Sequence, residues 1–199
     1  MHTLYCNLPW PLVLVGLLQK AALWMTYIGI EDEETVCLDW CGQFNTGGLE
    51  LCSPIPQNFD FGLCRKYQYV RVKLWPHAVS RNVMKLAEKA KEVILDTSGL
   101  GSTGLNIFLN NWLENGCDGL KFLSIRMGEY QEAEALNGIR DRVLDTEEEV
   151  NYKCYTGEFY RLSPGKRLRR DDGVIASFYY DRTTRILNFG VVDIPYCSD

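Results

Sequence analysis

A short apolar pattern recurs in the middle of this chain and constrains its fold more than any other feature. The pattern reads apolar-x-x-apolar-x-apolar: LKFLSI at residues 120–125, AKEVIL at 90–95 and, more loosely, YQYVRV at 67–72. The fourth residues of the three copies are Val70, Val93 and Leu123, at offsets of 23 and 30. Repeats of this length are typical of leucine-rich repeats, whose strands stack in parallel and return through helices.

The segments that follow the first two copies predict amphipathic helices. From residue 80 onward apolar residues recur at steps of three and four, and Ser80 is a candidate N-cap. The next helix begins with Ser102 or Thr103 as its cap and ends at Gly116. Its predicted inward face consists of Leu105, Phe108, Leu109, Trp112 and Leu113.

The sequence divides into four segments. Residues 1–30 are apolar, with a helix expected near 12–28, and residues 31–66 form a lead-in with strands expected at 35–40 and 49–52. Residues 67–150 form the repeat-like α/β region, which ends in a polar helix near 129–140 with Leu136 and Ile139 inward, and in an acidic loop at 145–149. Residues 151–199 form the last segment.

From residue 151 onward the apolar period changes to two, which predicts short antiparallel strands. Turns are expected at residues 171–173 and 181–184, and the basic run KRLRR at 166–170 is interpreted as a solvated turn. We therefore predict an α/β fold: a short leucine-rich-repeat-like solenoid, with parallel strands and outer helices, followed by an antiparallel β cap on its open end.

Charge and composition argue against several functions. The formal net charge is −5, so no positive field recruits nucleic acid or an acidic membrane surface. His2 and His77 stand in unrelated contexts, and the loop GLGSTG at 99–104 lacks the Lys-Ser/Thr ending of a phosphate-binding loop. We expect no enzymatic activity, no cofactor and no metal.

The N-terminal apolar run, residues 11–18, bears on localisation. It is shorter than the roughly 20 apolar residues needed to span a bilayer. As the core of a signal peptide it lacks a preceding Lys or Arg, and Ala21 and Ala22 offer a weak cleavage site. We expect an intracellular protein, in the cytoplasm or nucleus, with a secreted protein as the alternative.

The eight cysteines leave three interpretations open. Four of them crowd one stretch: Cys37, Cys41, Cys52 and Cys64. The other four are scattered: Cys6, Cys117, Cys154 and Cys197. Reduced thiols in the core are preferred, because free cysteine is among the most buried residue types. Disulfides would favour a secreted binding protein, and a zinc site in the crowded stretch lacks the two CxxC knuckles.

Three segments together resemble the type 2 F-box-associated domain, a large family in nematodes. They are LNIFLNNWL at 105–113, LKFLSI at 120–125 and RRDDGVIA at 169–176, which match the family's ordered helix, strand and turn motifs. The residues that carry the helix and strand motifs are Leu105, Phe108, Leu109, Trp112, Leu123 and Ile125. Those that carry the turn motif are Arg169, Arg170, Asp172 and Gly173.

The resemblance implies a protein-recognition module like the substrate-binding part of an F-box ubiquitin ligase subunit. In that family an N-terminal F-box binds a Skp-type adaptor. Here NLPWPLV at residues 7–13 has the Leu-Pro start of an F-box, while the rest of the motif does not match. The resemblance implies adaptor contacts at Leu8, Pro9 and Leu12. The alternative function is a secreted, disulfide-stabilised binding protein with an N-terminal signal peptide.

Overall fold

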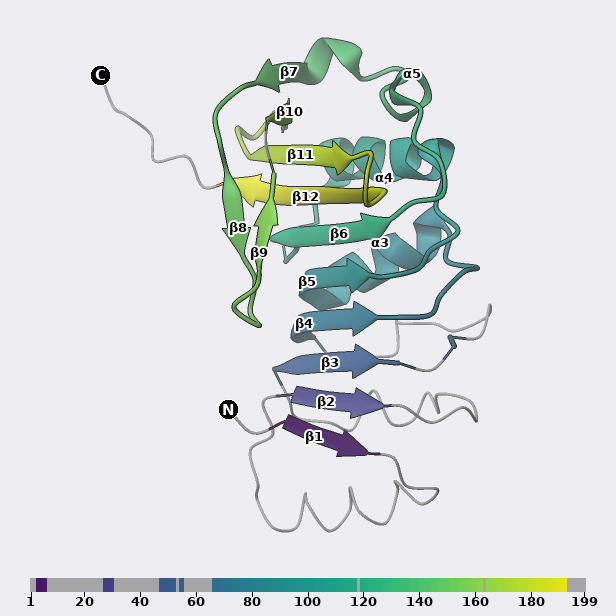
Figure 1. The fold of residues 1–199 in the computed structure, drawn as a ribbon. Coiled ribbons are helices and arrows are strands. Elements are labelled where there is room, and N and C mark those ends of the chain that lie inside the picture. Colours follow the sequence, from purple (N-terminus) through teal and green to yellow (C-terminus); the bar gives the residue numbers. More distant parts are fainter. Residues whose placement is uncertain are drawn as a thin grey trace, which may run out of the picture.

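The computed structural model describes residues 3–6, 27–30, 47–52, 54–55, 66–117, 119–162 and 164–192. In this part of the chain a mixed sheet of ten strands forms the frame, in the order β1-β2-β3-β4-β5-β6-β12-β11-β10-β7 (Figure 1). The expected strand at 35–40 lies outside the described residues. So does most of the expected helix near 12–28, whose last two positions begin strand β2.

The first six strands run parallel in chain order. They are β1 (Thr3–Cys6), β2 (Tyr27–Ile30), β3 (Gly48–Leu51), β4 (Tyr67–Val72), β5 (Ala90–Leu95) and β6 (Phe122–Arg126). Val70 pairs with Val93, and Val93 pairs with Leu123. This is the register that the repeated pattern predicts, so the parallel arrangement of residues 67–127 is confirmed.

Four antiparallel strands extend the same sheet beyond β6. They are β12 (Ile186–Val192), β11 (Ile175–Asp181), β10 (Gly165–Arg169) and β7 (Val143–Thr146). The antiparallel C-terminal strands are therefore confirmed, and β12 covers the edge of the last parallel strand. β7 pairs with β10 although it precedes residue 150, so the antiparallel part draws on the acidic segment that was expected to be a loop.

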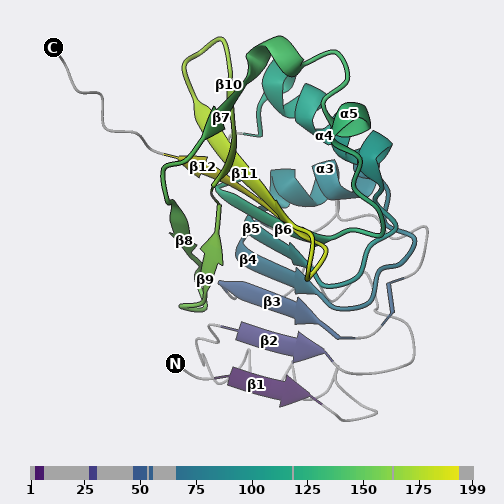
Figure 2. The same cartoon turned by 45° about the horizontal axis from the view of Figure 1, so that its top comes forward.

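The helices are α3 (Ser80–Lys89), α4 (Ser102–Asn115), the short α5 (Glu132–Ala135) and the 3-10 turn η2 (Arg140–Arg142). α3 and α4 lie together on one face of the sheet (Figure 2). Gly116 ends α4 as predicted, with a φ of 68°.

The predicted N-caps are wrong. Ser80, Ser102 and Thr103 lie inside the first turns of their helices. The side chain of Asn82 accepts a hydrogen bond from the Val79 amide (3.1 Å) at the start of α3, as the third helical residue of a capping box does. The Ser102 hydroxyl instead accepts a bond from the Gln131 amide (2.7 Å), and so joins α4 to the chain before α5.

The helix expected near 129–140 is shorter than predicted. Regular helix stops after Ala135, and Gly138 adopts a φ of 78°, a left-handed conformation that turns the chain. Leu136 and Ile139 are nevertheless buried as expected. Their burial was predicted from the spacing of the two apolar residues. Consecutive tight turns place residues at this spacing on one side of the chain, as a helix does.

The basic run at residues 166–170 is a strand, and its interpretation as a solvated turn is wrong. Leu168 is fully buried in β10. The flanking cations pair with carboxylates on neighbouring segments: Lys166 with Asp145 (2.7 Å) and Arg167 with Glu148. Neighbouring carboxylates, and not water, solvate these positive charges. A basic sequence can therefore form a strand that is paired on both sides.

The core lies between the sheet and the helices. It contains fully buried aromatic and aliphatic side chains from both layers, and Phe189 of β12 contacts two aromatic rings of α4. Among the described residues, no helix lies on the opposite face of the sheet. There the antiparallel pair β8 (Asn151–Lys153) and β9 (Phe159–Arg161) crosses the strands (Figures 1 and 2). This pair, with its turn, is called the hairpin below.

Candidate recognition face

The face of the sheet without helices carries a second, smaller cluster of buried side chains. Tyr69, Ile94 and Phe122 project from three adjacent parallel strands, and Cys154 and Leu162 meet them from the hairpin. These sheet residues alternate along their strands with the core residues, because successive side chains of a strand point to opposite faces. The hairpin therefore packs on the sheet through a small hydrophobic cluster, separate from the main core, which is called its seat below.

Aromatic rings fix the position of the hairpin. Tyr152 stacks on Phe122, with ring centroids 4.6 Å apart and planes within 6°. Tyr160 lies at 4.8 Å from the same Phe122 ring. At the other end of the hairpin Tyr155 stacks on Tyr69 at 6.2 Å. Such pairs stabilise a contact beyond the area they bury, so the hairpin is held in one orientation.

A buried carboxylate joins the hairpin to the sheet. Glu92 of β5 is 8% exposed and lies in register between Tyr69 and Phe122. It accepts hydrogen bonds from the Tyr152 hydroxyl (2.7 Å), the Tyr155 amide (2.7 Å) and the Cys154 thiol. Since a buried charge without partners is costly, three donors from one hairpin make Glu92 and the hairpin depend on each other.

The environment of Glu92 changes the acidity of its donors. Burial, with the hydrogen bond to Glu92, raises the pKa of the Cys154 thiol to about 12. Burial and the same carboxylate raise the pKa of the Tyr152 hydroxyl as well. Both groups keep their protons at neutral pH and act as donors. Because the thiolate is the reactive form of cysteine, Cys154 is a poor nucleophile in the folded protein.

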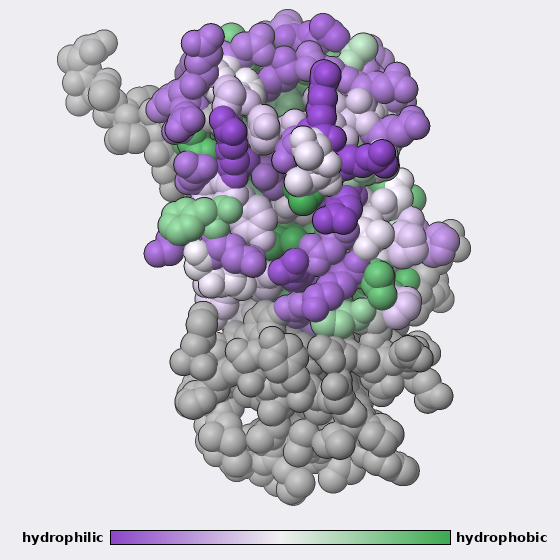
Figure 3. All heavy atoms as spheres, viewed as in Figure 1, coloured by the Kyte–Doolittle hydropathy of each residue, from purple (hydrophilic) through white to green (hydrophobic). Residues whose placement is uncertain are grey.

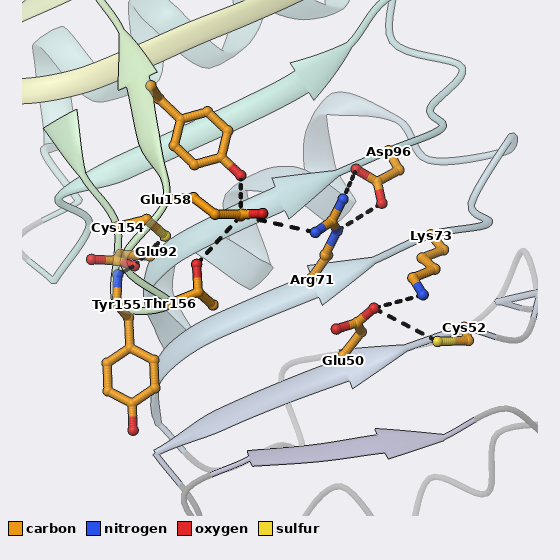
Figure 4. A network of polar contacts seen from close by, with 11 residues as sticks. Glu50, Cys52, Arg71, Lys73, Glu92, Asp96, Cys154, Tyr155, Thr156 and Glu158 are labelled. Atoms are coloured by element: carbon orange, nitrogen blue, oxygen red, sulfur yellow. Dashed lines mark hydrogen bonds and ion pairs between the residues drawn. The ribbon is translucent and has the colours of Figure 1, made fainter. Parts of the chain in front are cut away.

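Beside the hairpin the same face carries two ion pairs on open strands (Figure 4). Arg71 of β4 binds Asp96 in a bidentate manner, through Nε–Oδ2 at 2.7 Å and Nη2–Oδ1 at 3.1 Å. Lys73 Nζ lies 2.8 Å from the Glu50 carboxylate. We call these four residues the charged ladder. The hydrogen bond to Asp96 raises the pKa of Arg71, and the hydrogen bond to Glu50 raises that of Lys73.

The charged ladder is accessible where the hairpin ends. The side chains of Arg71, Lys73 and Asp96 are 28%, 41% and 29% exposed. Glu158 in the hairpin turn lies 4.0 Å from Arg71 and accepts a bond from the Tyr160 hydroxyl (2.8 Å). The surface on this side is mostly hydrophilic, with scattered apolar patches (Figure 3). The face thus combines a fixed hairpin with an accessible charged strip.

The predicted helix and strand motif residues form core and not surface. All six are buried and belong to the main core: Leu105, Phe108, Leu109, Trp112, Leu123 and Ile125. Phe108 and Trp112 contact the Phe189 ring edge-on, at centroid distances of 5.5 and 5.2 Å. Their role in this structure is packing.

The predicted turn motif meets the helix motif in space. Gly173, with a φ of 89°, lies in the turn between β10 and β11. The Arg170 guanidinium lies over the Trp112 ring at 5.5 Å, and Arg170 Nε donates to Asp172 at 3.1 Å. A Cβ on Gly116 would approach this guanidinium to 2.5 Å. Arg169 is exposed and lies outside this contact.

Several predicted sites fall on other parts of the chain. Leu8, Pro9 and Leu12 lie outside the described residues, and so do the side chains of five of the eight cysteines. The remaining three carry thiols: Cys52, Cys117 and Cys154. His77 is exposed in the turn after β4.

Two searches of the described residues bear on membranes and metals. Over those residues, no helix combines the length and the apolar character needed to cross a bilayer. Nor do three or more His, Cys, Asp or Glu side chains of the same residues come together as metal ligands. Three of the four cysteines of the zinc hypothesis lie outside this part of the chain.

Comparisons with known proteins add no assignment. No protein-family model matches the sequence, and no curated protein and no solved structure matches it at a significant level.

Sequence reasoning missed Glu92 and the seat of the hairpin. The signal was an acidic residue in the strand AKEVIL, on the same side as Ile94 and opposite to the core residues Val93 and Leu95. It could be recognised only with knowledge that Tyr152 and Cys154 lie over that strand, 60 and 62 residues later.

Proposed function

We propose that this protein is a recognition module that binds another protein through the face of the sheet without helices. The observation that carries the proposal is the composition of that face. A rigidly seated hairpin borders a strip of partly exposed charged side chains, Arg71, Lys73 and Asp96, at the C-terminal ends of adjacent strands. Charged groups held in fixed geometry are suited to select a complementary surface.

A short leucine-rich-repeat-like solenoid is part of the proposal. It is supported by the spacing of paired residues, since Tyr27, Gly48 and Tyr69 follow one another in register at intervals of 21. Intervals of 23 and 30 lead on from Tyr69 to Glu92 and Phe122. Stacked repeats with helices on one side leave the other side as an extended binding surface.

The link to a ubiquitin ligase rests on the resemblance to F-box-associated domains. The proximity of Trp112, Arg170 and Gly173 supports it, because the separate helix and turn motifs then serve one packing unit. In this proposal Leu8, Pro9 and Leu12 contact a Skp-type adaptor, and the sheet face binds the target.

Target binding is tested by site-specific crosslinking. A photoreactive amino acid is placed at Lys73 on the sheet face and, as a control, at Ile107, which is 46% exposed on α4. We expect a defined protein to crosslink from position 73 and not from 107. That protein, once purified, should bind the wild type and bind Arg71→Glu at least about tenfold more weakly. Equal crosslinking from both positions contradicts the proposal.

Adaptor binding needs a separate measurement. The full-length chain and a Leu8→Ser/Leu12→Ser variant are compared for binding to a purified Skp-type adaptor by biolayer interferometry. Binding lost in the variant supports the assignment, whereas no binding by the wild type removes the ligase link and leaves target recognition standing.

The redox state of the cysteines distinguishes the intracellular module from the secreted alternative. Alkylation before lysis of the native source, followed by mass analysis, counts free thiols directly. Eight free thiols support the intracellular module. A disulfide that joins Cys37 or Cys41 to Cys52 or Cys64 transfers the preference to a secreted binding protein.

A further inference from the structure

A small pocket opens where β10 and the end of β11 meet the chain around the start of α5. It has a volume of about 160 Å³. Its walls come from the chain before α5, from the start of β10, and from the end of β11 with the turn that follows. They are formed by Tyr130, Glu132, Pro164, Gly165, Lys166, Phe178, Tyr179, Tyr180 and Arg182.

The size and walls of the pocket fit one aromatic ring. A cavity of about 150 Å³ in another protein holds a benzene molecule. Here Tyr130 and Tyr180 stack with centroids 4.4 Å apart and offer ring faces and edges to a guest. A Cβ on Gly165 would approach the Phe178 carbonyl oxygen to 2.4 Å, so a side chain at that position is excluded.

One charged group in the lining, Arg182, is left to bind an anionic neighbour of that ring, whereas Lys166 and Glu132 pair with each other. Lys166 is bound by two carboxylates, Asp145 at 2.7 Å and Glu132 at 3.2 Å, which neutralise it. Arg182 at the pocket is exposed and has no ion-pair partner within the described ranges.

We infer that this pocket receives an aromatic side chain of a partner polypeptide, with an acidic residue beside it bound by Arg182. The ring enters between the Tyr130–Tyr180 pair and the strand ends, and the flanking carboxylate remains at the rim. The lining contains neither Glu92 nor any residue of the charged ladder, so the inference goes beyond the proposed function and can be tested without it.

Three acetylated and amidated pentapeptides provide the probe: Glu-Glu-Phe-Glu-Glu, Glu-Glu-Ala-Glu-Glu and Lys-Lys-Phe-Lys-Lys. Each is titrated into the ¹⁵N-labelled full-length chain, and amide shifts are followed by NMR. We expect the first peptide to shift the amides of Gly165, Lys166 and Tyr179. The alanine peptide should bind at least about tenfold more weakly, because it lacks the ring that the pocket buries.

Two variants and one control locate the binding. Arg182→Glu changes an exposed side chain and should weaken the acidic aromatic peptide about three- to tenfold. Tyr130→Ala removes a wall and should abolish the difference between the Phe and Ala peptides. Arg81→Glu, an equal charge reversal on exposed α3, should leave binding unchanged. Equal binding of the first two peptides, preference for the lysine peptide, or full binding by Arg182→Glu would overturn the inference.

Discussion

The two faces of the sheet are stabilised by different means. On the helix side, residues such as Val93 and Leu95 of β5 enter one continuous apolar core. On the hairpin side, the alternate residues Glu92 and Ile94 of the same strand meet a hairpin through a buried carboxylate and a small cluster. Apolar packing tolerates many partners, whereas a carboxylate with three donors accepts one geometry. The first face therefore stabilises the fold, and the second fixes the position of one hairpin.

The helix face gives the largest expected effect. Trp112→Ala removes a fully buried indole that contacts Phe189 and carries the Arg170 guanidinium. We expect the free energy of unfolding to fall by about 3–5 kcal/mol, as for other large truncations in protein cores. Urea unfolding followed by circular dichroism measures it. A loss under about 1 kcal/mol would show that this face is not the main source of stability.

The stability that the hairpin face contributes is tested by Glu92→Ala. The matched control is Glu88→Ala, at an exposed position of α3. The variant leaves the Tyr155 amide and the Tyr152 hydroxyl without their acceptor. Hydrogen bonds to charged groups contribute about 1.5–3 kcal/mol, so we expect a loss of about 2–3 kcal/mol and under 0.5 for the control.

Hydrogen exchange measured on the same two proteins resolves where the loss falls. Amides of the hairpin, residues 151–161, should lose protection in Glu92→Ala while those of α4 keep theirs. If both regions lose protection equally, the two faces form one cooperative unit, and the comparison drawn above fails.

Alkaline pH should weaken the hairpin face selectively. The folded pKa of Cys154, about 12, lies above that of an unfolded thiol, so its contribution is complete below about pH 8.5 and is lost as the pH rises toward 12. Between pH 8 and pH 10 this costs about 1–2 kcal/mol, since the unfolded state releases the proton first. Cys154→Ala should flatten the dependence of stability on pH over that range. An unchanged slope would assign the alkaline loss to the tyrosines.

The smallest effect is expected at the charged ladder. Arg71 and Asp96 are more than a quarter exposed, and pairs of this kind contribute about 0–1 kcal/mol. A double-mutant cycle of Arg71→Ala and Asp96→Ala should give a coupling energy below about 1 kcal/mol in urea unfolding. A coupling above 2 kcal/mol would make the ladder a structural element and weaken its proposed role in recognition.

The parallel half of the fold could be predicted from the sequence, and the reason is periodicity. The pattern in residues 67–72, 90–95 and 120–125 places one apolar residue of each strand beside the next, as the pairing of Val70, Val93 and Leu123 confirms. The helical spacing of apolar residues in 105–113 likewise identified Trp112 and Leu109 as core residues. Local spacing suffices where each element packs against its neighbours in the chain.

The rest depended on contacts between distant segments. A period of two in residues 151–162 fits a strand in the main sheet and a strand of a separate hairpin equally well, so it could not show that β8 and β9 leave the sheet. The basic run at 166–170 became a strand because Asp145 and Glu148 lie across from it. Neither the separate hairpin nor the basic strand can be predicted from a few neighbouring residues. The pocket between α5 and the ends of β10 and β11 also depends on contacts between distant segments.

The place of β12 in the sheet has a consequence for biosynthesis. Its residues 186–190 pair with residues 122–126 of β6, so about sixty further residues must leave the ribosome before that edge is covered. Until then the nascent chain presents an open strand edge, and Phe108 and Trp112 await the ring of Phe189. Translation that stalls before this strand leaves a ready template for aggregation and a target for chaperones. The pairing of β12 with β6 therefore sets the time at which this edge is closed to other chains.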